Sequence, residues 1–141
     1  MKEWDEVKNE IWKVGPEKEL ARSILRMVEI RLGAIKSLNK KNFTPIIIEN
    51  YYEIVKELIT ALMSIDGNKT LSHEALVVYL KRFYTNFTKN ELFLIDQLRQ
   101  LRNKIVYKGF FVHGEYLKRN ESQLSLIIEK LRKILNEKLS D

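Results

Sequence analysis

Residues 45–65 read PIIIENYYEIVKELITALMSI, and they carry the most regular apolar pattern in the chain. Large apolar side chains recur there at spacings of four, three, four and three residues: Tyr51, Val55, Leu58, Leu62 and Ile65. This spacing places the side chains on one face of an α-helix. Neighbouring apolar residues widen that face, which predicts that the helix lies at the centre of a bundle.

Similar patterns on both sides predict further helices, at residues 3–14, 17–39, 73–84, 88–108 and 121–139. Two capping-box patterns, Thr88 with Glu91 and Asn120 with Gln123, favour helix starts at these points. The last helix has an alternative start near Tyr116. Gly109 is suited to end the helix before it, because glycine readily adopts the left-handed conformation of a helix C-cap.

These elements predict an all-α fold, an antiparallel bundle of four to five main helices plus a short N-terminal helix. The chain has only 5 glycines and 2 prolines, and no alternating strand pattern supports a βαβ arrangement. No linker or repeat divides the 141 residues. We therefore expect a single helical domain over residues 1–141.

The composition narrows the classes of function. Cysteine is absent and histidine is limited to His73 and His113, so we expect no metal, no cofactor and no cysteine nucleophile. The charged N-terminus and the lack of a long apolar run predict a cytoplasmic protein without a membrane partner. Abundant Lys, Glu and Ile without Cys is typical of hyperthermophiles. The net charge of +6 permits a nucleic-acid partner without requiring one.

One segment, LRQLRNKIVYKG at residues 98–109, combines groups that suit recognition. Arg102 lies one turn from both Leu98 and Ile105, which puts it at the margin of the apolar stripe. Asn103 and Tyr107 share the neighbouring side of the helix. A guanidinium, an amide and a phenol together suit a phosphate or a base. The alternative is structural, with Arg102 paired to a core-facing Glu that orients the bundle.

With these residues the sequence resembles the HEPN domains, small helical bundles widespread in archaea and bacteria. The resemblance covers about residues 48–135, through ENYYEIVKELITAL at 49–62, SHEAL at 72–76 and LRNKIVY at 101–107. It implies a helical bundle that forms a homodimer through the helices carrying the motif. Many such domains are metal-independent endoribonucleases of toxin–antitoxin systems. Others are non-catalytic partners of minimal nucleotidyltransferases or bind nucleotides or nucleic acid.

The family signature is an Arg, a polar residue, and a His four to six residues after the Arg. It matches Arg102 and Asn103, but Tyr107 stands where the His is expected. Histidine can transfer protons near neutral pH, whereas tyrosine is a poor base there. We therefore expect a non-catalytic or weakly active module that binds RNA, nucleotides or a protein partner. The alternative is an active endoribonuclease that uses Tyr107, His73 or His113 instead.

Lys104, Lys108 and His73 complete the candidate site. Lys104 and Lys108 extend the positive charge around Arg102, with Lys118 and Arg119 beyond them; the alternative is a solvated mixed surface. His73 opens the helix at 73–84, either as a structural helix-start residue or as a ligand-binding group. His113, next to Gly114, is interpreted as a residue of an exposed turn.

Overall fold

Five long helices follow one short N-terminal helix in a computed structural model that describes residues 1–140. This confirms the all-α helical bundle. The helices are α1 (Trp4–Val7), α2 (Lys18–Ser37), α3 (Thr44–Asp66), α4 (His73–Phe83), α5 (Lys89–Lys108) and α6 (Glu115–Leu139). Two short antiparallel strands, β1 (Ile11–Lys13) and β2 (Asn68–Thr70), form a small sheet at one end.

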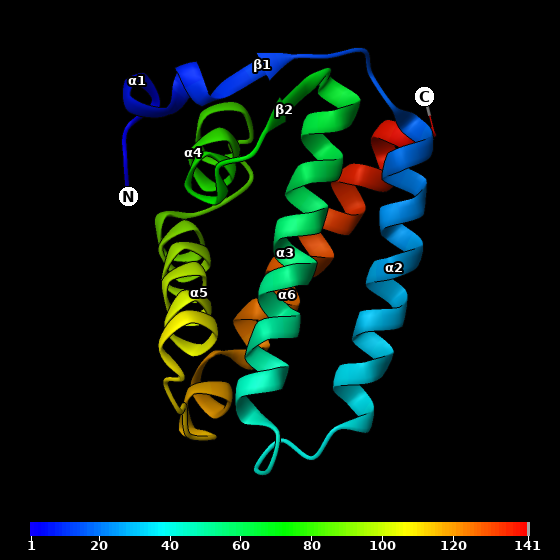
Figure 1. The fold of residues 1–141 in the computed structure, drawn as a ribbon. Helices are drawn as coiled ribbons and strands as arrows, with labels where there is room; N and C mark the ends of the chain where they lie inside the picture. Colours follow the sequence, from blue (N-terminus) through cyan, green and yellow to red (C-terminus); the bar gives the residue numbers. More distant parts are fainter. Residues whose placement is uncertain (141) are drawn as a thin grey trace.

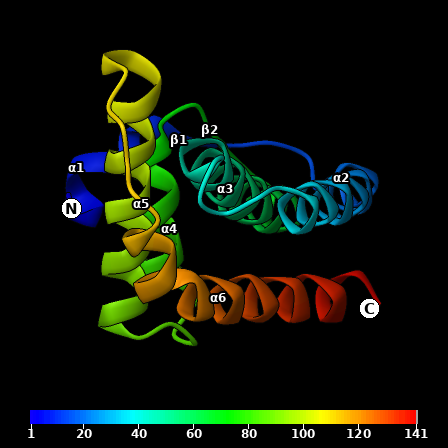
Figure 2. The ribbon, with the colours of Figure 1, turned by 90° about the horizontal axis from the view of Figure 1, so that it is seen from below.

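Helix α3 lies at the centre of the bundle, as its apolar pattern predicts. It packs against α2, α4, α5 and α6, and thirteen of its residues are buried. Figure 1 shows α2 antiparallel to α3, and Figure 2 shows α6 alongside this pair. Helices α4 and α5 cover the remaining side of α3. No helix within the described residues 1–140 is long and apolar enough to cross a bilayer.

The N-terminal segment differs from the predicted helix at residues 3–14. Helix α1 ends at Val7, a 3₁₀ turn covers Lys8–Glu10, and Ile11 begins strand β1. The physical reason is a pairing partner distant in sequence. Strand β1 pairs with β2, and the Val14 amide donates to the Gly67 carbonyl at 2.9 Å. Gly67 has a φ of +82°, and a Cβ there would lie 3.1 Å from the Val14 carbonyl oxygen, so this turn requires glycine.

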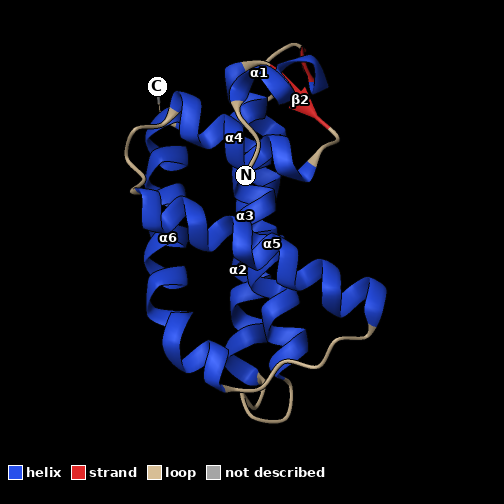
Figure 3. Cartoon of the chain, turned by 90° about the vertical axis from the view of Figure 1, so that its left-hand side faces the viewer, coloured by secondary structure: helices blue, strands red, loops and turns tan. Residues whose placement is uncertain are grey.

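Helix α5 begins and ends where the sequence predicts. The Glu91 amide donates to Thr88 Oγ1 at 3.1 Å and the Thr88 amide donates to Glu91 Oε1 at 2.9 Å, a complete capping box. Gly109 ends the helix with a φ of +61°. All buried residues of α5 lie between Glu91 and Leu98. Its C-terminal half projects from the bundle, as Figure 3 shows.

Helix α6 begins at Glu115, close to the alternative start at Tyr116 and not at residue 121. The Asn120–Gln123 pattern therefore lies inside the helix, where no free amides need capping. Asn120 Nδ2 instead donates to the Tyr116 carbonyl one turn earlier, at 3.0 Å.

The C-terminal residue of α3 organises the end of the bundle near the sheet. Asp66 Oδ2 accepts hydrogen bonds from the hydroxyls of Tyr79 and Tyr84, each at 2.7 Å, and Asp66 Oδ1 lies 3.0 Å from Lys138 Nζ. We call these four residues the Asp66 cluster. One carboxylate thereby links α3, α4, the residue that follows α4, and α6.

Candidate functional site

Arg102 lies on the buried margin of α5, where its guanidinium meets groups from α3 and α5. Its Nη2 is 3.3 Å from Glu53 Oε1, and its Nη1 donates to Asn103 Oδ1 at 3.3 Å. The guanidinium carbon lies 5.6 Å from the centre of the Tyr52 ring and 5.9 Å from that of Tyr107. The Arg102 side chain is only 16% exposed, and its buried Nε atom has no hydrogen-bond partner among residues 1–140.

The ion pair with Glu53 is the contact that the structural interpretation of Arg102 predicts. Glu53 does not serve Arg102 alone, since its Oε2 lies 2.5 Å from Lys56 Nζ. One carboxylate is therefore shared by two cations. One donor of Arg102, its Nε, has no partner among the described residues. The nearby ring of Tyr107, whose centre lies 5.9 Å from the guanidinium carbon, belongs to a residue that is 74% exposed.

A second ion-pair group continues the site along α5 toward its N-terminus. Arg99 Nη2 lies 3.1 Å from Asp96 Oδ1 and 3.8 Å from Glu74 Oε2, at the start of α4. The Arg99 side chain is 15% exposed. Arg99 and Arg102 are three residues apart, so they lie on neighbouring turns of one helix face.

The structure brings His73 to this group, although it lies far from Arg102 in the sequence. His73 is the first residue of α4, held there by Ser72, whose Oγ accepts from the Ala75 amide at 3.2 Å. The His73 ring centre is 5.9 Å from that of Tyr52, the ring that also contacts Arg102. Burial, and then the positive charges of Lys56, Arg102 and Arg99, hold the pKa of His73 below its ordinary value, with Glu53 opposing them.

We call this group the Arg102 cluster; its members come from three helices, and each contacts at least one other member. They are Tyr52, Glu53 and Lys56 of α3, His73 and Glu74 of α4, and Asp96, Arg99, Arg102, Asn103 and Tyr107 of α5. Three carboxylates balance three cations, and the lowered pKa of His73 favours its uncharged form. An anion that binds here must compete with Glu53 for Arg102.

The remaining predicted residues lie away from this cluster. Lys104 Nζ lies 5.9 Å from the ring centre of Phe110, and Lys108 is exposed in the last turn of α5. Neither forms an ion pair in the part of the chain that the structure describes. His113 lies in the exposed connection between α5 and α6, as predicted, with its ring 6.3 Å from that of Phe111.

Sequence reasoning missed six members of the cluster: Tyr52, Glu53, Lys56, Glu74, Asp96 and Arg99. A signal for Arg99 was present, because it precedes Arg102 by three residues on the same helix. The α3 residues gave no such signal, since their position opposite α5 depends on the packing of the bundle. No group of three or more His, Cys, Asp or Glu residues suited to a metal ion is found among residues 1–140.

The arrangement is suited to binding an anion beside an aromatic ring. Arg102 supplies a guanidinium with a spare donor, Asn103 an amide, and Tyr107 an exposed ring, while neutral His73 can gain a proton. Comparisons of this chain with protein-family models, with curated proteins and with solved structures find no match.

Proposed function

We propose that the protein is a HEPN-type helical module that binds RNA at the Arg102 cluster. The observation that carries this proposal is the guanidinium of Arg102, held between Tyr52 and Tyr107 with its Nε unpaired. Arg102 would contact a phosphate, Asn103 a phosphate or base edge, and Tyr107 a base or ribose. Arginine and exposed aromatic rings are the groups by which proteins hold unpaired nucleotides.

The binding test is fluorescence anisotropy of a labelled single-stranded RNA at about 50 mM and about 200 mM salt. We expect Arg102→Ala to weaken binding about tenfold and to reduce the salt slope by about 1, the effect of losing one phosphate contact. Arg31→Ala is the matched control. Arg31 pairs with Glu57 on α3 at 2.5 Å, as Arg102 pairs with Glu53, but it lies on α2 outside the cluster.

Equal and negligible binding by the wild type, Arg102→Ala and Arg31→Ala would reject RNA binding and favour the structural interpretation of Arg102. Equal losses in the two variants would show that only overall charge matters. The same measurement with a mononucleotide distinguishes RNA from a nucleotide ligand.

The position of His73 favours a second candidate, a metal-independent endoribonuclease. In such a reaction the 2′-hydroxyl attacks the adjacent phosphorus, the 5′-oxygen leaves, and a 2′,3′-cyclic phosphate remains. Neutral His73 would accept the 2′-hydroxyl proton, Arg102 would stabilise charge on the phosphate, and solvent water would supply the proton that the leaving 5′-oxygen takes up. Incubation with RNA in EDTA tests this candidate. Cleavage to a cyclic phosphate should be lost in both His73→Gln and Arg102→Ala, and cleavage no greater than that of Arg102→Ala rejects it.

We also propose that two copies pair through the face of α5 that bears Arg102. The C-terminal half of α5 has no buried residue and presents Val106 and Tyr107 to solvent. Sedimentation of the wild type and of Val106→Glu tests this proposal, with a dimer expected only for the wild type. A monomeric wild type at micromolar concentration would reject the homodimer. It would favour pairing of this face with a different protein, such as a nucleotidyltransferase.

A further inference from the structure

An open pocket of about 480 Å³ lies between Gln97 of α5, the loop that follows α5, and the start of α6. Its wall consists of Gln97 of α5, four residues of the connecting loop and four residues of α6, among them the carboxylate of Glu115. We name it the Phe110 pocket, after its lining residues Gln97, Phe110, Phe111, Tyr116, Arg119 and Asn120. Gln97 and Arg102 are five residues apart, about 140° around the helix, so the pocket and the Arg102 cluster lie on different sides of α5.

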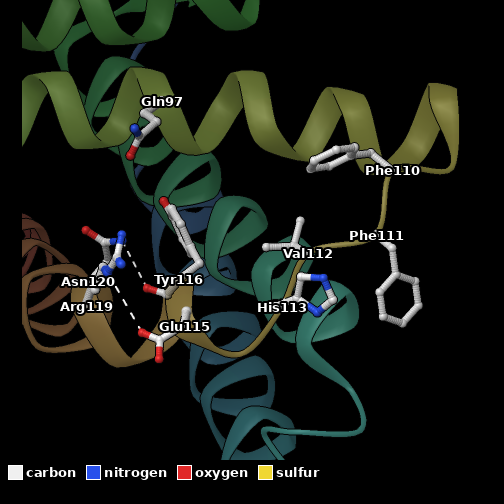
Figure 4. Close-up of a pocket in the computed structure, with 9 residues that line it drawn as sticks. All are labelled: Gln97, Phe110, Phe111, Val112, His113, Glu115, Tyr116, Arg119 and Asn120. Atoms are coloured by element: carbon white, nitrogen blue, oxygen red, sulfur yellow. Dashed lines mark hydrogen bonds and ion pairs between the residues drawn. The ribbon is translucent and has the colours of Figure 1, made fainter.

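The polar groups of the pocket are incompletely paired. The Tyr116 hydroxyl is buried and has no hydrogen-bond partner among the described residues. The Asn120 side-chain amide donates one hydrogen bond to the Tyr116 carbonyl. The side-chain oxygen of Asn120 can still accept a hydrogen bond from a ligand. Figure 4 shows Gln97 reaching from α5 toward the side on which the Tyr116 hydroxyl lies. Because buried polar groups in native proteins are nearly always paired, the hydroxyl is expected to bond to water or to a group that enters the pocket.

The apolar part of the pocket is aromatic and open to solvent. Phe110 is 49% exposed and Phe111 is 70% exposed, so both rings are available for stacking. Cations stand at the rim. Lys104 lies over Phe110, and Arg119 is 3.9 Å from its ion-pair partner Glu115, with 78% of the Arg119 side chain exposed.

We infer that the Phe110 pocket holds an unpaired nucleobase of the RNA strand whose phosphate contacts Arg102. A base is planar and can stack on Phe110, and its edge carries the mixed donors and acceptors that a phenol and two amides can meet. A duplex hides these edges, so the ligand is single-stranded and passes around the projecting end of α5. This inference rests on the proposed function, from which it takes the class of ligand.

Free uridine and adenosine are the probes, because they carry a base but no phosphate and so do not need Arg102. Binding is followed by NMR through the side-chain amide signals of Gln97 and Asn120. We expect a saturable shift in the wild type and in Arg102→Ala. In Tyr116→Phe we expect affinity to fall at least about threefold. Melting temperature should stay the same or rise, because the change removes only an unpaired buried hydroxyl.

Tyr51→Phe is the matched control, since it deletes the same atom elsewhere. The Tyr51 hydroxyl donates to Glu121 Oε2 at 2.7 Å, so this variant should melt at a lower temperature and bind nucleosides as the wild type does. Tyr116→Phe should lower nucleoside affinity but not the melting temperature, and Tyr51→Phe should do the reverse. This contrast distinguishes a ligand-binding hydroxyl from a structural one.

Three results would overturn the inference. These are no nucleoside-dependent shift in the wild type, equal affinity in Tyr116→Phe, and saturation by benzyl alcohol with no response to either nucleoside. Failure of the proposed function looks different, because then Arg102→Ala leaves oligonucleotide binding unchanged. Nucleoside binding that survives such a result would show a base site without a phosphate site and would still support the pocket.

Discussion

The Asp66 cluster and the Arg102 cluster both join α3 to its neighbours through charged and aromatic side chains, but they differ in how completely their donors are paired. In the Asp66 cluster one carboxylate accepts from two hydroxyls and one ammonium, and Asn68 Nδ2 adds a hydrogen bond to the Tyr79 hydroxyl at 3.1 Å. In the Arg102 cluster a carboxylate is shared between two cations and a guanidinium nitrogen is left unpaired. A fully paired network contributes stability, whereas an incompletely paired one leaves donors for a ligand.

The largest effect is expected from breaking the paired network. Asp66→Ala leaves two largely buried hydroxyls and Lys138 without their acceptor, and we expect the free energy of unfolding to fall by about 2–4 kcal/mol. RNA binding should persist below the lowered melting temperature. Urea unfolding measures the loss. Asp5→Ala is the control, because the pair of Asp5 with Lys8 is exposed and should contribute under about 0.5 kcal/mol. If Asp66→Ala is as stable as Asp5→Ala, the paired network of the Asp66 cluster does not contribute more stability than an exposed ion pair, and the contrast with the Arg102 cluster fails.

An intermediate effect is expected from freeing Arg102. Glu53→Gln removes the carboxylate that competes with phosphate, so RNA affinity should rise about three- to tenfold, equivalent to about 0.6–1.4 kcal/mol. Glu57→Gln is the control, since it makes the same change in charge one turn along α3, where the partner is Arg31. Anisotropy titrations compare the two. If both variants gain equally, the net charge of the protein causes the effect and Glu53 does not gate the site.

The smallest effect is expected from the titration of His73. Its pKa in the folded protein is lowered by burial and nearby cations, so the unfolded chain takes up the proton first as the pH falls. Stability should therefore be constant above about pH 6.5 and decline below it. A bound phosphate opposes the cations, so RNA affinity should rise about threefold over the same decrease in pH. His73→Gln should flatten both profiles, and a pH dependence of the same size in the variant would exclude His73 as its source.

The helices of the fold were largely predictable because their signals are local. The apolar spacing at residues 45–65, the Thr88–Glu91 capping box and the glycine at 109 each act within a few residues of the chain. Strand β1 was not predictable in this way. Val7, Ile11 and Val14 also fit a helical spacing, and the extended form prevails because Asn68–Thr70 provides a partner 57 residues further along, as Ile11 pairs with Thr70 and Lys13 with Asn68.

The candidate site likewise contains residues that local spacing predicts and residues that only the packing of the helices brings together. Arg102, Asn103 and Tyr107 are neighbours on one helix, so their spacing indicated that they lie together. Glu53 and Lys56 belong to α3, and only the packing of α3 against α5 reveals that they share the site. Lys104 shows the opposite case. It is two residues from Arg102, but the helix turns it toward Phe110 and the other side of α5.

The pairing of β1 with β2 has a consequence for the order in which the chain folds. During synthesis Ile11–Lys13 leaves the ribosome before its partner Asn68–Thr70 exists. Val7 has the same dependence, because it packs against Ala75 and Val78 of α4. Residues 7–13 are thus made well before the residues that they contact in the folded protein. The helical hairpin of α2 and α3 is complete at Asp66. It can therefore form before residues 7–13 have the partners with which they pack and pair.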